Sequence, residues 1–307
     1  MNPIVKRILG ELQAPDLLDR LERLSPSDCN SLWMEIHKRK AENRSPADVL
    51  KAYRSNRFVR PSELNPIRLC QLQSDLMRIA NECGIRPVQL SPLAPLGSCA
   101  AFACVDQNKI VSAARGCEVL SDASNMLSLY LADEISSGRL DGTQSIHACS
   151  VDRTVRAQVF QGARTSAHFS LFCLVSCGRD SGSYQCEGEL LDKQLAFYQD
   201  YFRMEQHATF SILLRKRSGY PDGDGFFAYV LRLLRERFPN LPITTEEAAM
   251  DNCYYQGVNF KMYMHVGEEK IEIGDGGFTD WMQRLLNNQK QRCLISGIGI
   301  DRLALMA

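Results

Sequence analysis

The stretch CLISGIGIDRLAL, at residues 293–305, has the pattern of a strand that passes through a tight turn into a helix. Leu294 and Ile295 form a short apolar run of the kind found in buried strands. Gly297 and Gly299 stand one residue apart, and residues without a side chain let a backbone or a ligand approach closely. The stretch therefore predicts a buried strand that ends where another backbone or a ligand comes near.

The helix that follows predicts a phosphate contact. Asp301 is a residue type that caps helix N-termini, and Arg302 comes directly after it. Arg302 would then lie at the strand-to-helix junction with a fixed fork of donors, which suits a phosphate group. The alternative interpretation is an ordinary glycine turn with a surface arginine, because so short a motif also occurs by chance.

Composition and charge exclude several classes of protein. The chain has 307 residues, which predicts one large or two ordinary domains. Its 36 lysines and arginines balance 36 aspartates and glutamates, so no overall basic field favours unspecific nucleic-acid binding. No apolar run approaches the roughly 20 residues that span a bilayer, and the N-terminus lacks the layout of a signal peptide. We therefore expect a cytoplasmic protein with no membrane partner.

The 12 cysteines include no Cys-x-x-Cys pair, and neither Cys173 with Cys177 nor Cys99 with Cys104 lies beside a second histidine or cysteine pair at zinc spacing. Disulfides are rare in cytosolic proteins of this length. We interpret most of these cysteines as small buried apolar residues.

Residues 1–64 have the pattern of a domain of short helices. Apolar residues recur there at helical spacing, and Ser45 followed by Pro46 is typical of a helix start. Several lysines and arginines make the surface mildly basic, which indicates either a docking face for tRNA or a carrier protein, or an ordinary solvated face. The segment 61–66 is typical of a linker, so we expect a second domain over residues 65–307.

Two strand-like segments enclose a loop between residues 156 and 175. The first begins at Arg156 and contains Gln158, and the second begins at His168 and continues with Phe169. The loop between them holds Arg164. Runs rich in β-branched and aromatic residues on both sides of a loop predict a hairpin.

A third stretch begins with YYQGVNF at residues 254–260 and continues into a predicted hairpin over residues 261–273. It ends with GDGGFTD at residues 274–280, which a helical segment follows.

In this order, the motifs resemble the catalytic core of histidyl-tRNA synthetase, a class II aminoacyl-tRNA synthetase. The end of the chain resembles motif 3 of that class, and the hairpin that contains Arg156 resembles motif 2. A long helix predicted over residues 67–83, with a strand after it, is similar to motif 1, the dimer-forming element. The resemblance covers residues 65–307. It implies an α+β fold, in which helices flank an antiparallel sheet, and a homodimer.

The resemblance also implies the residues of a site. Arg156 and Arg302 would be catalytic and hold ATP together with Arg164, while Phe169, in preference to Phe172, would stack on adenine. Carboxylates available for Mg²⁺ are those of Glu272 and Asp275. Positions expected to bind the substrate are Asp122, Gln158, Tyr254, Tyr255, Gly276, Gly277 and Asp280.

Several positions depart from the histidyl pattern. Met250 stands where the histidyl enzymes carry an arginine that helps adenylation, and Gln158 replaces a glutamate of motif 2. Leu171 and Val175 stand where those enzymes hold histidine with polar side chains. Apolar side chains cannot pair with an ammonium group, and an unpaired buried charge is costly. We therefore expect a ligand other than histidine, which lacks the amino group or binds it differently, or a pocket that no longer turns over.

Two functions follow from these features. The first is an ATP-dependent ligase that activates a small carboxylate, an amino or organic acid, as an acyl-adenylate. The second is a catalytically silent binding subunit that resembles the regulatory subunit of ATP phosphoribosyltransferase. No segment similar to an anticodon-binding domain follows Arg302, so we do not expect the chain to decode a tRNA in the usual way. Both hypotheses require Arg156 and Arg302 to lie on one site.

Overall fold

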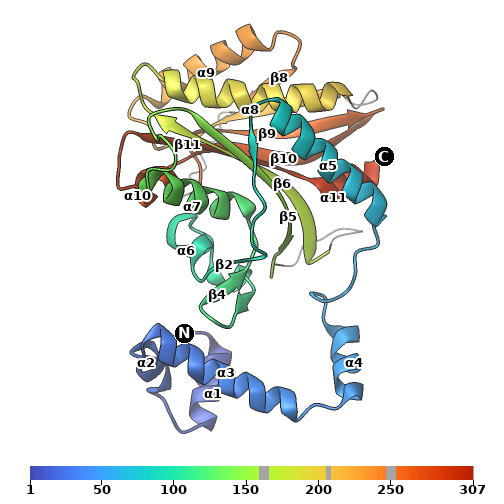
Figure 1. Ribbon diagram of the computed structural model, residues 1–307, viewed down its shortest axis with the longest axis vertical. Helices are drawn as coiled ribbons and strands as arrows, with labels where there is room; N and C mark the ends of the chain where they lie inside the picture. The colour runs from blue at the N-terminus through green and yellow to red at the C-terminus, as the bar shows by residue number, and fades with distance from the viewer. Residues whose placement is uncertain (159–165, 205–208, 247–253, 307) are drawn as a thin grey trace.

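The computed structural model describes residues 1–158, 166–204, 209–246 and 254–306, and it contains one large sheet with helices on both faces (Figure 1). The six central strands pair antiparallel, and each edge strand pairs parallel with its neighbour. In spatial order the strands are β1 (Arg86–Pro87), β5 (Ile146–Val155), β6 (His168–Arg179), β11 (Gln291–Gly299), β10 (Glu269–Thr279), β9 (Gln256–Val266), β7 (Thr209–Lys216) and β8 (Ile243–Glu246). The expected α+β fold is confirmed.

Two apolar cores lie on the two faces of this sheet. On one face, Phe172 and Phe197 are fully buried and stack with their ring centroids 5.1 Å apart. On the other face, Phe102 and Trp281 meet edge to face at 5.4 Å. The first face is covered by α5 (Pro66–Glu82), α8 (Gln185–Met204) and α9 (Gly223–Arg237), and the second by α6 (Ser98–Phe102), α7 (Ala123–Ser136) and α10 (Trp281–Leu285).

The end of the chain has the predicted strand and helix, with one correction. α11 (Ile300–Met306) follows β11 directly and begins one residue before Asp301. Asp301 therefore does not cap the helix, and its carboxylate instead accepts a hydrogen bond of 2.9 Å from the backbone N–H of Ser170 in β6. The side chain thus ties α11 to the strand that lies beside β11.

A small second sheet lies below α6 and α7 in the view of Figure 1. It consists of β2 (Leu93–Pro95), β4 (Cys117–Val119) and β3 (Ser112–Ala113), and a short 3₁₀ helix, η1 (Gln107–Lys109), precedes β3. The carboxylate of Glu118 is fully buried and accepts backbone N–H bonds from Gly97, at 2.9 Å, and Cys99, at 3.3 Å. This buried carboxylate satisfies the donors at the start of α6.

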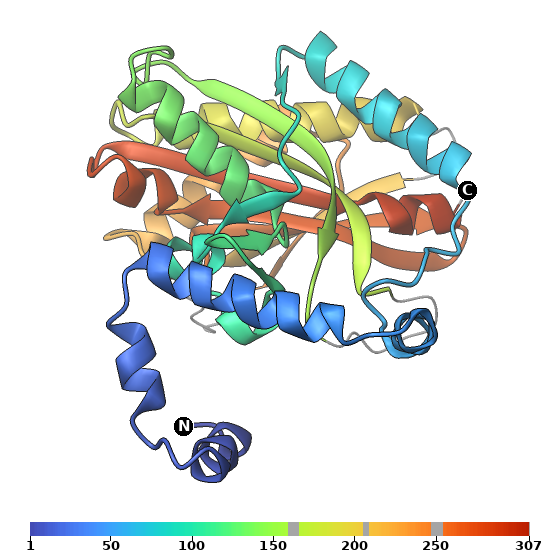
Figure 2. The ribbon, with the colours of Figure 1, turned by 60° about the horizontal axis from the view of Figure 1, so that its bottom comes forward.

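Four helices at the N-terminus lie apart from the sheet (Figures 1 and 2). Ser45 and Asp48 form the capping box of the fourth helix, which confirms the predicted helix start at Ser45 and Pro46. Of the residues in these four helices, all of which the structure describes, Leu9 is the one that is buried. The helices are α1 (Pro3–Glu11), α2 (Leu17–Glu22), α3 (Pro26–Glu42) and α4 (Pro46–Ser55).

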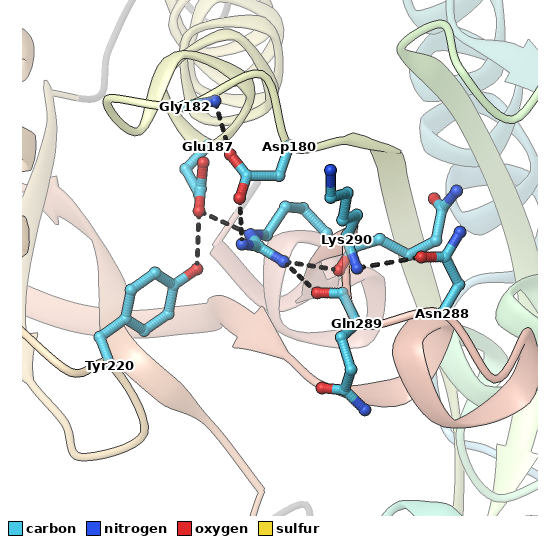
Figure 3. Close-up of polar contacts among 9 residues, drawn as sticks. Asp180, Gly182, Glu187, Tyr220, Asn288, Gln289 and Lys290 are labelled. Atoms are coloured by element: carbon cyan, nitrogen blue, oxygen red, sulfur yellow. Dashed lines mark hydrogen bonds and ion pairs between the residues drawn. The ribbon is translucent and has the colours of Figure 1, made fainter.

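An ion-pair cluster joins the start of β11 to α8 (Figure 3). Arg292 donates to Glu187 at 2.8 Å and to Asp180 at 2.6 Å, and the Tyr220 hydroxyl donates to Glu187 at 3.1 Å. We call these four residues the Arg292 cluster. The Arg292 side chain is 16% exposed and the Glu187 side chain 1% exposed, so these two opposite charges pair where little water reaches them.

Among the described residues, no helix is long and apolar enough to cross a bilayer.

Candidate functional site

A cavity of about 430 Å³ opens where β10, β11 and α11 meet the ends of β5 and β6. Both Arg156 and Arg302 line it, although they lie far apart in the sequence. The motif-like segments thus do meet around one space. Most of the remaining lining residues come from strands of the sheet or from the start of α7. The full set of remaining lining residues is Asp122, Ser124, Ser166, Phe169, Leu171, Cys173, Tyr254, Tyr255, Glu272, Ile273, Gly274, Asp275, Ile295, Ser296, Gly297, Gly299, Asp301 and Leu305.

Arg156 follows the last residue of β5, so the strand lies before Arg156, and residues 156–158, which the sequence predicts as the start of a strand, lie outside it. Its Nε donates to the carbonyl oxygen of Ser121 at 3.1 Å. Its guanidinium carbon lies 5.2 Å from the ring centroid of Phe169, within the range of a cation–π contact. A carbonyl and an aromatic face orient this arginine while leaving its charge uncompensated by either contact.

Arg302 reaches back from α11 to the sheet. Its guanidinium donates to the backbone carbonyl of Glu272 in β10. A Cβ placed on Gly299 would have the Arg302 side chain as its nearest neighbour, at 3.5 Å. That distance is an ordinary van der Waals contact, so the position of Arg302 does not by itself require a glycine at 299.

A β-bulge brings two carboxylates to the same side of β10. The register between β10 and β9 shifts between Glu272 and Gly274, which leaves Ile273 as the extra residue. In a regular strand, residues three positions apart point to opposite faces. The extra residue reverses this parity, so Glu272 and Asp275 both line the cavity.

Two carboxylates that line the cavity are each held by a tyrosine. The Tyr254 hydroxyl donates to Asp122 at 2.8 Å, and Asp122 also caps α7. Burial raises the pKa of Asp275, a hydrogen bond from the Tyr255 hydroxyl opposes that rise, and the nearby charge of Asp122 adds to it. The pKa values of Tyr254 and Tyr255 are also raised well above the usual value, chiefly by burial. Both tyrosines therefore remain neutral donors.

The residues present fit Mg²⁺ only in part. Glu272 forms an ion pair of 2.7 Å with Lys261, and its side chain is 40% exposed. Within the described segments, no three histidine, cysteine, aspartate or glutamate side chains gather as a metal site. Mg²⁺ commonly takes one or two carboxylates and completes its shell with phosphate oxygens and water. Glu272 and Asp275 can supply carboxylates of that kind, provided that a bound phosphate supplies further ligands.

The structure separates the two phenylalanines that could stack on a base. Phe169 lines the cavity, whereas Phe172 is fully buried in the core against Phe197. Leu171 also lines the cavity, and Val175 is fully buried away from it. The preference for Phe169 therefore agrees with the geometry.

Four predicted substrate positions lie off the cavity wall. Gln158 is exposed beyond the end of β5, and Asp280 lies at the start of α10, 3.9 Å from Arg284. Gly276 and Gly277 are buried within β10, where a Cβ on Gly277 would lie 2.6 Å from the Tyr255 ring. The absence of a side chain at Gly277 therefore leaves the space that the Tyr255 ring occupies. Arg164 and Met250 lie outside the described residues.

Sequence reasoning missed Cys173, which lines the cavity with 2% exposure. Burial raises the pKa of its thiol, so it remains a neutral thiol. A signal for it existed, because Phe169, Leu171 and Cys173 alternate along β6 and residues two apart share a face.

Comparison with solved structures finds the same architecture in three synthetase-type proteins. The apo histidyl-tRNA synthetase of S. aureus has a TM-score of 0.62 at 10% identity, over 80% of this chain and 68% of that chain. A Bacillus halodurans protein described as an ATP phosphoribosyltransferase regulatory subunit/histidyl-tRNA synthetase has a TM-score of 0.61 at 10% identity, over 80% and 82%. A pyrrolysyl-tRNA synthetase of Desulfitobacterium hafniense has a TM-score of 0.51 at 11% identity, over 84% and 71%.

No protein-family model and no curated protein sequence matches the chain. At about one identical residue in ten, the likeness to solved structures establishes the fold. The core of this protein has the fold of the class II aminoacyl-tRNA synthetase catalytic core, as seen in histidyl-tRNA synthetase.

Proposed function

We propose that the cavity binds ATP and activates a small carboxylate as its acyl-adenylate. The observation that carries this proposal is the meeting of Arg156, Arg302 and Phe169 on one cavity. Two guanidinium groups match the charge of a triphosphate, and the aromatic ring of Phe169 suits a purine ring. Each charge-assisted contact to a phosphate would contribute about 1.5–3 kcal/mol.

The reaction needs little from the protein beyond orientation and charge. An oxygen of the substrate carboxylate attacks the α-phosphorus of ATP, the bond from that phosphorus to the bridging oxygen breaks, and pyrophosphate leaves. Arg156 and Arg302 would stabilise the negative charge that gathers on the phosphate oxygens. Mg²⁺ held by Glu272 and the phosphates would neutralise the leaving pyrophosphate.

Two of the carboxylates that line the cavity indicate the class of acid. Asp122 and Asp275 both line the cavity, and each accepts a bond from a tyrosine hydroxyl. A carboxylate has further lone pairs, so both can accept from a ligand as well. We therefore propose a substrate that carries a positive group, such as an ammonium, beside its carboxylate. The apolar side chain of Leu171 cannot make the polar contact that the histidyl enzymes make to their substrate at this position. In this proposal the carboxylate of Asp275 pairs with the ammonium group instead.

The test is ATP–pyrophosphate exchange across a panel of amino acids, each paired with its des-amino acid. We expect exchange with at least one ammonium-bearing acid, tenfold less with its des-amino partner, and loss in Arg302→Ala. Arg203→Ala, which removes an arginine 77% exposed on α8, is the matched control and should behave like the unmodified chain. Exchange with none of the acids, together with no ATP binding by calorimetry, would contradict the proposal.

A catalytically silent binding subunit is the second candidate. It is favoured by the apolar side chain of Leu171 on the cavity and by the similarity to a structure described as a regulatory subunit/histidyl-tRNA synthetase. Measurable binding of a nucleotide or a cationic acid without any pyrophosphate exchange would select this function over the ligase.

A further inference from the structure

A second groove, of about 460 Å³, lies where the linker between the N-terminal helices and the core crosses the ends of β5 and β6. Its lining combines apolar side chains with two arginines and a histidine, and it contains no carboxylate among the described residues. The lining residues are Phe58, Val59, Arg60, Pro61, Ser62, Leu64, Pro66, Leu69, Arg153 and His168. We call this the linker groove.

Hydrogen bonds fix the shape of the linker groove. Arg57 donates to the carbonyl oxygen of Ala157, so the linker is tied to the residue after Arg156. Arg153 donates from Nε to His168 Nδ1 at 2.9 Å, which leaves the proton of the imidazole on Nε2. That Nε2 lies 2.5 Å from the carbonyl oxygen of Arg60 and donates to it. A groove held in this way loses little conformational entropy when it binds a partner.

The charge of the groove comes from its arginines. His168 accepts from Arg153 on one nitrogen and donates to the carbonyl oxygen of Arg60 from the other. Arg60 lies with its guanidinium carbon 5.1 Å from the ring of Tyr53, and Arg153 also donates to the Ser170 hydroxyl at 3.3 Å. Neither arginine forms an ion pair within the described segments. Their charge is therefore available to an anionic partner.

Helix α4 extends this surface beyond the groove. Val49, Leu50 and Tyr53 are 55%, 49% and 40% exposed, and Val59 of the linker is 49% exposed. Lys51 and Arg54 stand beside them on the same short helix. Apolar side chains that gather on an exposed surface commonly mark an interaction site. The helix and the groove thus present apolar side chains with lysine and arginine side chains nearby.

We propose that the linker groove and α4 dock an acidic protein segment that carries apolar side chains. Aliphatic residues and prolines are half of the lining residues, and such side chains contact apolar side chains of a protein, whereas single-stranded RNA binds chiefly by stacking on aromatic rings. Carboxylates of the partner would pair with Arg60 and Arg153. The proposal does not depend on nucleotide binding, because the groove shares no residue with the candidate ATP cavity.

The test is a selection of random 12-residue peptides on the full chain, followed by binding of the enriched peptides by fluorescence anisotropy. We expect the enriched peptides to carry Asp or Glu beside Leu, Ile or Phe. Their affinity should fall at least tenfold in Arg153→Glu and in Val59→Asp, two exposed positions, and stay unchanged in the control Arg203→Glu.

Three outcomes would overturn the proposal. Enriched peptides without acidic residues would remove the role of the arginines, and peptides insensitive to both groove variants would place docking elsewhere. A 12-nucleotide single-stranded RNA that binds more tightly than any peptide, and that loses binding in Arg153→Glu, would assign the groove to RNA.

Discussion

The two ends of the β6–β11 strand pair carry arginines in opposite circumstances. At one end, Arg292 is enclosed by Glu187 and Asp180 in the Arg292 cluster (Figure 3), and its charge is neutralised within the protein. At the other end, Arg156 and Arg302 donate to backbone carbonyls and line an open cavity. The comparison shows how one residue type can serve structure at one end of a strand pair and present charge to a ligand at the other.

The largest effect is expected at the enclosed end. Arg292→Met leaves Glu187 buried without its charged partner, and breaking a buried pair in this way costs about 3–5 kcal/mol. We expect that loss in the free energy of unfolding, measured by urea denaturation. Arg203→Met, which breaks an exposed pair with Asp200, should change it by less than about 1 kcal/mol. Equal effects of the two variants would remove the structural role of the Arg292 cluster.

At the open end, Arg302→Ala should cost affinity rather than stability. Losing one charge-assisted contact to a phosphate corresponds to about 1.5–3 kcal/mol, or roughly ten- to 150-fold in the dissociation constant for ATP. The free energy of unfolding should change by less than about 1 kcal/mol, because the residue is exposed. A variant that unfolds as readily as Arg292→Met, while binding ATP normally, would reverse the comparison.

Asp275→Asn, a substitution on the cavity wall, should change stability and ligand binding in opposite directions. The raised pKa of Asp275 means that ionisation is unfavourable in the folded state, so its carboxylate lowers stability as pH rises above the unfolded value of 3.8. We expect the variant to be more stable at pH 7, by about 1 kcal/mol, and equal to the unmodified chain near pH 3.

The same variant should bind a cationic acid less well. Because a cationic ligand favours the ionised carboxylate, the affinity of the unmodified chain should rise with pH as Asp275 loses its proton. In Asp275→Asn this part of the pH dependence should vanish. A pH profile of affinity, by calorimetry, that stays the same in the variant would exclude Asp275 from the substrate site.

The smallest effect is expected at Phe169. Phe169→Leu keeps an apolar side chain and removes the aromatic face, which should weaken ATP binding by about 0.5–1.5 kcal/mol. The matched control, Phe58→Leu in the linker groove, should leave ATP binding unchanged. Equal affinity of Phe169→Leu and the unmodified chain would remove the stacking role.

Local patterns in the sequence predict much of this fold. Apolar runs, glycines and caps indicate β11 followed by a helix, the β9–β10 hairpin, and the helix over residues 67–83. The convergence of Arg156 and Arg302 also follows from motif order, because each motif has a known place on the sheet. The elements depend on residues close together in the sequence, whereas the convergence of the two arginines follows only from the resemblance to a known fold.

The features that could not be predicted depend on partners distant in sequence. The bulge at Ile273 depends on pairing between β9 and β10, so nothing local shows that Glu272 and Asp275 share a face. Asp301 looks like a helix cap because its true partner, the N–H of Ser170, belongs to another strand. Arg292 has no local signal either, because its two carboxylates come from the end of β6 and from α8.

The most direct measurement is ATP titration by calorimetry of the unmodified chain, Arg156→Ala, Arg302→Ala and the double variant. If both guanidinium groups contact one nucleotide, each single variant should lose at least tenfold in ATP affinity. The loss of binding free energy in the double variant should also differ from the sum of the two single losses by about 0.5 kcal/mol or more, within the range of ~0.5–3 kcal/mol that is typical of coupled residues. ATP affinity that is unchanged in either single variant would contradict the shared site.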